Sequence, residues 1–100
     1  MPTVYVTAPR SAAAELAETL VDEQLAACVN HVDGHSTYRW EGEVVTDDAT
    51  SLLIKTTDDG SDRLESRIDQ LHPYDVPCIE RFDETALLGR FGEWIAESVE

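Results

Sequence analysis

The chain is poor in basic residues and in cysteine. Seven lysines and arginines stand against 21 acids, the formal net charge is −14, and Lys55 is the single lysine. Proteins that bind DNA or RNA need a basic surface for the phosphates, so the composition argues against a nucleic-acid partner. Cys28 and Cys78 are too few for a disulfide framework and lack Cys-x-x-Cys spacing, so free thiols are expected, although either could ligate a metal.

Long apolar runs are also absent. No segment approaches the ~18 apolar residues of a membrane span, and no secretory signal pattern opens the chain. These features predict a soluble, cytoplasmic protein with no membrane contact. The acids are spread over the whole chain among 42% apolar residues. This pattern fits a folded protein in high salt, where screening relieves self-repulsion, and the alternative is an ordinary acidic cytosolic protein.

Two overlong strand patterns dominate the middle of the sequence. They run over Cys28–Trp40 and Glu43–Thr57, whereas a common strand has about five or six residues. At roughly 3.3 Å per residue each arm would reach ~45 Å, so the distal half of this hairpin should project from a domain of radius of gyration near ~13 Å. Gly42 is expected to adopt a positive φ at the tip. Asp33-Gly34 predicts a bulge or bend in the first arm.

The rest of the chain predicts one α+β domain over residues 1–100. We expect a strand at residues 3–7 and a helix at residues 11–26, capped by Ser11. A second helix is expected at residues 61–72, ending at His72, then an edge strand at residues 76–82 and a last helix at residues 85–99. The order βαββαβ plus a C-terminal helix predicts a ferredoxin-like sheet. Right-handed crossovers would place both main helices on one face, which leaves the other face and the hairpin for homo-oligomer contacts.

Four blocks of sequence carry a resemblance to a known family. They are Leu25–Asn30 (LAACVN), Tyr38–Gly42 (YRWEG), Leu52–Thr56 (LLIKT) and His72–Pro77 (HPYDVP). In order and spacing they resemble the signature blocks of the CutA divalent-cation tolerance proteins. The resemblance implies a ferredoxin-like homotrimer similar to the PII signalling proteins, with a role in tolerance of copper and other divalent cations. With the acidic charge, it also suggests a member from a salt-loving organism.

The resemblance bears on a metal site. Family members with a proposed copper site carry ligands at the positions of Val6, Leu71 and His72, so only His72 remains here. A histidine at a helix C-terminus can bind a metal, or it can hydrogen-bond the helix end and shape the following turn. Cys28 is the second candidate ligand, and its alternative is a packed thiol. A bound Cu²⁺ or another divalent cation is the only cofactor that this reading suggests.

The resemblance also implies clefts between subunits, lined by Trp40, Lys55, His72 and Tyr74, that could hold a small anion or a metal. For Lys55 the alternative is pairing with a carboxylate. The predicted oligomer contacts are Tyr38, Trp40, Glu41 and Gly42.

The favoured function is therefore a trimeric divalent-cation tolerance protein. The alternative is a PII-like sensor that binds a small ligand in the clefts, and the lack of a glycine-rich phosphate loop counts against a nucleotide. No nucleophile–base pair and no anion cradle around Arg10 is evident, so the sequence predicts a protein that is not an enzyme.

Overall fold

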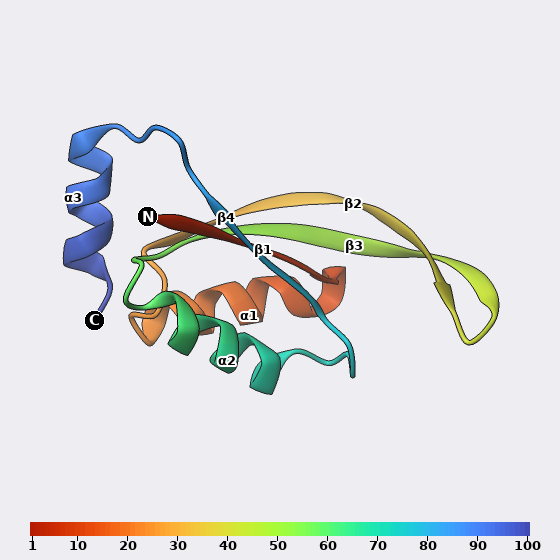
Figure 1. Cartoon of the computed structure of the whole chain (residues 1–100). Helices are drawn as coiled ribbons and strands as arrows, with labels where there is room; N and C mark the ends of the chain where they lie inside the picture. Colours follow the sequence, from red (N-terminus) through yellow and green to blue (C-terminus); the bar gives the residue numbers. More distant parts are fainter.

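A single antiparallel sheet organises the chain. The computed structural model, which describes all of residues 1–100, has four strands in the order β2-β3-β1-β4 (Figure 1). In chain order the elements are β1 (Pro2–Pro9), α1 (Arg10–Asp22), β2 (Cys28–Trp40), β3 (Glu43–Lys55), α2 (Ser61–Leu71), β4 (Cys78–Asp83) and α3 (Gly89–Ser98). The predicted α+β, ferredoxin-like fold with its long hairpin is confirmed.

Helices α1 and α2 cover one face of the sheet (Figure 1). Alternate residues of the central strands point toward them, so that Val4, Val6, Leu52 and Ile54 are fully buried. Each helix packs apolar residues at helical spacing against these strands, namely Leu16 and Leu20 from α1 and Leu64 and Ile68 from α2. The shared placement of both helices is the one that the right-handed crossovers predict.

The opposite sheet face has no helix on it. It carries an edge-to-face aromatic pair, Tyr5 and Phe82, with ring centroids 6.2 Å apart. Phe82 and Val32 on this face are exposed. The prediction of an uncovered face is therefore confirmed for the single chain. None of the helices combines the length and the apolar character that a bilayer crossing demands.

The hairpin of β2 and β3 projects as predicted. Each arm has 13 residues, the distal end extends beyond the helices in Figure 1, and the molecule measures 45 Å along its longest axis. Glu41 and Gly42 form its two-residue turn with φ values of 49° and 82°. Two consecutive positive φ values match the twist of the arms, and this is why glycine is favoured at the second position. The second arm ends at Lys55, two residues before the predicted end at Thr57.

The predicted bulge at Asp33-Gly34 is wrong. The pairing of β2 with β3 continues one-to-one through Asp33↔Thr50 and Gly34↔Ala49 to the tip. A Cβ placed on Gly34 would meet no atom within 4 Å, and its φ is not positive. Gly34 is thus an ordinary strand residue.

These two glycines give a matched prediction. We expect Gly42→Ala to lower the free energy of unfolding by about 1 kcal/mol, because alanine is strained at positive φ. We expect Gly34→Ala to be neutral or slightly stabilising, since glycine in a strand interior only adds disorder to the unfolded chain. Urea unfolding followed by circular dichroism measures both. A larger loss for Gly34→Ala than for Gly42→Ala would contradict the assignment of the turn.

Helix α1 ends earlier than the sequence predicts. It spans Arg10–Asp22 instead of Ser11–Ala26, and no side chain caps its start, so Ser11 is not a cap. At its C-terminus Gln24 adopts a φ of 60°, Leu25 N–H bonds the Leu20 carbonyl and Gln24 N–H bonds that of Val21. This pair of bonds is the usual helix stop with glycine at the left-handed position. Because glutamine occupies this position instead of glycine, the sequence does not predict where the helix ends.

Helix α3 is also shorter than predicted, because residues 85–88 are not helical and the helix begins at Gly89. Of the apolar residues at helical spacing in this segment, Leu88, Phe91, Ile95 and Val99, only Ile95 is buried, and Leu88 is 61% exposed. The side chain of Leu87 packs against Gly92. A Cβ added at Gly92 would lie 3.2 Å from Leu87 Cδ2, so a larger residue there would crowd this contact. The strand ends differ by smaller amounts: β1 runs to Pro9, and β4 starts at Cys78, after Pro77, as the edge strand that the proline predicts.

Candidate functional site

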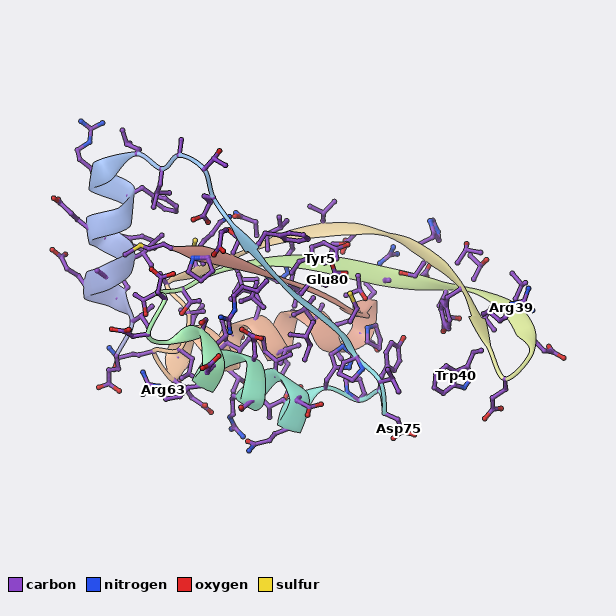
Figure 2. All side chains as sticks on the ribbon, in the orientation of Figure 1. Tyr5, Arg39, Trp40, Arg63, Asp75 and Glu80 are labelled. Carbon is purple, nitrogen blue, oxygen red and sulfur yellow. The ribbon has the colours of Figure 1, made fainter.

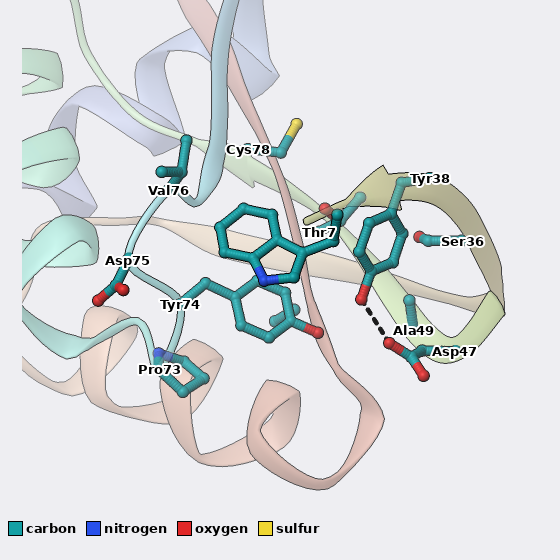
Figure 3. A pocket seen from close by; sticks show the side chains of 12 residues that line it. Thr7, Ser36, Tyr38, Asp47, Ala49, Pro73, Tyr74, Asp75, Val76 and Cys78 are labelled. Carbon is teal, nitrogen blue, oxygen red and sulfur yellow. Dashed lines mark hydrogen bonds between the residues drawn. The ribbon is translucent and has the colours of Figure 1, made fainter. Parts of the chain in front are cut away.

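A pocket of about 520 Å³ lies between the distal hairpin and the loop that joins α2 to β4. We call it the aromatic pocket and define it by Ser36, Tyr38, Trp40, Asp47, Tyr74 and Val76. Figure 2 shows Trp40 projecting from the hairpin back toward the loop that carries Asp75. In Figure 3 the rings of Tyr38 and Tyr74 approach each other across the cavity.

Strand alternation explains the hairpin side of the aromatic pocket. Ser36, Tyr38 and Trp40 are two residues apart on β2, so their side chains share one face. Ser36 pairs with Asp47 across the ladder, which puts that carboxylate on the same face. The hairpin thus contributes two aromatic rings and one acid.

A hydrogen bond couples two of these groups. The Tyr38 hydroxyl donates to Asp47 Oδ2 over 2.5 Å, as the dashed line in Figure 3 marks. This bond to the carboxylate is the main reason why the pKa of Tyr38 rises to about 12, with burial and Tyr74 adding smaller effects. At neutral pH the hydroxyl therefore keeps its proton and holds Asp47 in place against the wall of the pocket.

The loop side of the pocket is held by His72. This residue is 7% exposed, and its Nε2 lies 2.8 Å from the Thr7 carbonyl oxygen, where it must donate. Its Nδ1 accepts the Tyr74 backbone N–H over 3.1 Å, and the two rings are 5.0 Å apart. The imidazole therefore ties β1 to the turn that presents the Tyr74 ring.

The two predicted metal ligands do not meet. His72 bonds Thr7 of β1, whereas Cys28 lies beside Lys55, whose partner on β1 is Thr3. Four residues of strand separate Thr3 from Thr7, which is about 13 Å. Both nitrogens of His72 have hydrogen-bond partners, and no group of three or more His, Cys, Asp or Glu side chains is arranged to hold a metal. A single chain therefore offers no preformed metal site that fits these residues.

Lys55 also lies apart from the aromatic pocket, at the other end of the sheet. The alternative of pairing with a carboxylate is not found directly either, because the Lys55 Nζ has no carboxylate within 4 Å and donates to Thr3 Oγ1 over 3.1 Å. Thr3 in turn donates to Glu84 Oε1 over 2.5 Å, so the charges are connected through a hydroxyl. Burial raises the pKa of the Cys28 thiol, and the nearby ammonium of Lys55 opposes this rise. Of the predicted cleft residues, the structure brings together Trp40 and Tyr74 in the aromatic pocket, with His72 beside Tyr74, and only Lys55 lies apart.

Ser36, Asp47 and Val76 are the residues of the aromatic pocket that the sequence analysis did not single out. Asp47 lies on β3, the second arm of the hairpin. Counting back from the Glu41-Gly42 turn places it opposite Ser36, so register alone could have found it. Val76 is exposed and follows Tyr74 in a loop, where no periodic signal exists.

Comparison with known proteins agrees with the fold and the four sequence blocks. The family described as CutA1 divalent ion tolerance protein matches residues 2–98. A divalent-cation tolerance protein CutA from Thermus thermophilus is 42% identical over 97 residues, which cover 95% of this chain and 94% of that protein.

Solved structures of similar proteins share the fold of this chain over nearly its whole length. CutA1 from Pyrococcus horikoshii has a TM-score of 0.95 at 35% identity, covering 100% of this chain and 99% of that one. The PII-like protein CutA from a Nostoc species has a TM-score of 0.96 at 30% identity, covering 100% and 98%. With sequence and fold matched over nearly their whole length, this chain belongs to the CutA1 divalent ion tolerance protein family.

Proposed function

We propose that the chain is the subunit of a homotrimer that acts in tolerance of divalent cations, copper among them. The observation that carries this function is the family match over residues 2–98. Support for assembly comes from the sheet face that no helix covers and from the projecting hairpin with exposed Val44 and Trp40. The net charge of −14 supports attraction of cations to the surface, and it also supports a working environment of high salt.

A growth experiment tests this function. The chain is expressed in a bacterial strain that lacks its own CutA protein, and growth is measured over graded Cu²⁺ and Zn²⁺ concentrations. We expect expression to restore growth at concentrations that inhibit the deletion strain. The same strain with an empty vector is the control. Identical growth of the two strains with every divalent ion tested would refute the tolerance function.

We further expect that metal binding does not depend on His72. Both of its nitrogens hold hydrogen bonds, so a metal would have to displace Thr7 or Tyr74. Calorimetric titration of Cu²⁺ and Zn²⁺ into wild type, His72→Gln and Cys28→Ser measures this. Similar weak binding in all three indicates attraction to the carboxylate surface. Stoichiometric binding that disappears in His72→Gln would identify His72 as a ligand and contradict our expectation, whereas a loss in Cys28→Ser alone would identify Cys28 as the ligand.

The aromatic pocket favours a second candidate function, a PII-like sensor that binds a small ligand. Its volume of about 520 Å³ lies within the usual range for ligand sites. We propose no catalytic role. The one thiol at the pocket, Cys78, has a pKa raised by burial and by its bond to Glu80, so it is a weak nucleophile.

A further inference from the structure

The composition of the aromatic pocket selects among ligands. Three rings, those of Tyr38, Trp40 and Tyr74, line it together with two acids, Asp47 and Asp75, and none of its lining residues is lysine, arginine or histidine. An anionic ligand would find no cationic partner there and would be repelled by Asp47. The walls favour a ligand with a positive charge and an apolar body.

The charge of Asp47 is available to such a ligand. No basic side chain lies within 4 Å of its carboxylate, and its hydrogen-bond partner is the neutral Tyr38 hydroxyl. Arg10 is the nearby cation at the neighbouring shallow depression, which it shares with Asp47 and Tyr74. Its guanidinium lies 3.7 Å from Asp48 Oδ2 and donates to the Gly34 carbonyl over 2.9 Å. The Arg10 guanidinium is therefore already engaged by Asp48 and the Gly34 carbonyl.

The rings decide between kinds of cation. A hard metal ion needs several oxygen ligands arranged around it, and the two acids of this pocket, Asp47 and Asp75, belong to no cluster that could hold a metal. An alkylated ammonium spreads its charge over methyl groups, which can contact the faces of Trp and Tyr directly. Sets of aromatic rings are the usual means by which proteins recognise quaternary ammonium groups.

We propose that the aromatic pocket binds a small organic cation of the alkylated-ammonium class, with its charge between Asp47 and the rings of Trp40 and Tyr74. This site rests on the ligand-binding alternative and is independent of metal tolerance. Trp40 is also a predicted oligomer contact, so the site has to be tested in the assembled protein.

The test compares choline with 3,3-dimethyl-1-butanol, the neutral molecule of the same shape. Each is titrated into the assembled wild-type protein at fixed salt, and binding is followed by tryptophan fluorescence and calorimetry. We expect choline to bind at least about tenfold more tightly, because only the cation gains from the rings and the carboxylate. Equal affinities, or no choline binding to the assembled protein, would overturn the proposal.

Two neighbouring acids supply the matched variants. Asp47→Asn is expected to weaken choline binding by about tenfold, whereas Asp48→Asn, with the same change in net charge, should leave it unchanged because Asp48 does not line the aromatic pocket. Tyr74→Leu should also weaken binding, and light scattering verifies that each variant keeps the wild-type mass. Equal losses in both aspartate variants would overturn the proposal in favour of a general field effect. Cu²⁺ titration and growth of the same variants report separately on metal tolerance.

Discussion

Transfer from molar to millimolar KCl at pH 7 is expected to lower the melting temperature by at least about 10 °C, or roughly 2 kcal/mol for a chain of this size. The Debye length grows from about 3 Å at 1 M to about 30 Å at 0.01 M. The longer of these exceeds two of the three molecular dimensions, 45 × 26 × 20 Å, so that carboxylates repel across the whole molecule. Three of the seven basic residues, Arg10, Arg67 and Arg81, are already paired with acids, so they do little to offset the charge of the remaining carboxylates.

Light scattering after size exclusion accompanies this measurement. At molar salt we expect three times the 11.1 kDa mass of one chain, with dissociation or unfolding when salt is removed. Near the isoelectric point of about 4.3 the net charge vanishes, so the salt dependence should shrink there. An unchanged melting temperature at pH 7 would refute the high-salt interpretation, and the mass of a single chain at molar salt would refute the trimer.

Ile54→Ala is expected to lower the free energy of unfolding by about 2–5 kcal/mol. Ile54 is 0% exposed and lies on β3 between Val4 of β1 and Val29 of β2, facing the helices. Truncation would leave a cavity at the centre of the core, because three strands and two helices cannot all close around it. Guanidinium unfolding at fixed molar salt and fixed protein concentration measures the change.

Leu88→Ala is the control for this prediction. Sequence periodicity places Leu88 on the apolar stripe of the last helix, whereas the structure leaves it 61% exposed just before α3. Its truncation should change the free energy of unfolding by less than about 0.5 kcal/mol. Similar losses for the Ile54 and Leu88 variants would contradict the placement of the core.

Local chemistry explains which parts of the fold could be predicted. The hairpin was predictable because strand alternation continues over both arms and glycine stands at the position of the turn that requires positive φ. The end of α1 was not, since Gln24 adopts the left-handed conformation without being glycine. The start of α3 was missed because residues 85–88 continue an apolar pattern that the chain does not use for a helix.

The fold class, the projecting hairpin and the family could be predicted from the amino-acid sequence, because strand alternation, helical spacing and four short blocks are local patterns. The site depends on tertiary packing. Packing brings Tyr74 of the loop between α2 and β4 next to Tyr38 and Asp47 of the hairpin, although no local pattern relates this loop to the hairpin. It also separates Cys28 and Lys55 from His72. The tertiary structure also shows that both nitrogens of His72 are occupied. These contacts depend on how strands and loops that are distant in the sequence pack together, so local sequence patterns do not predict them.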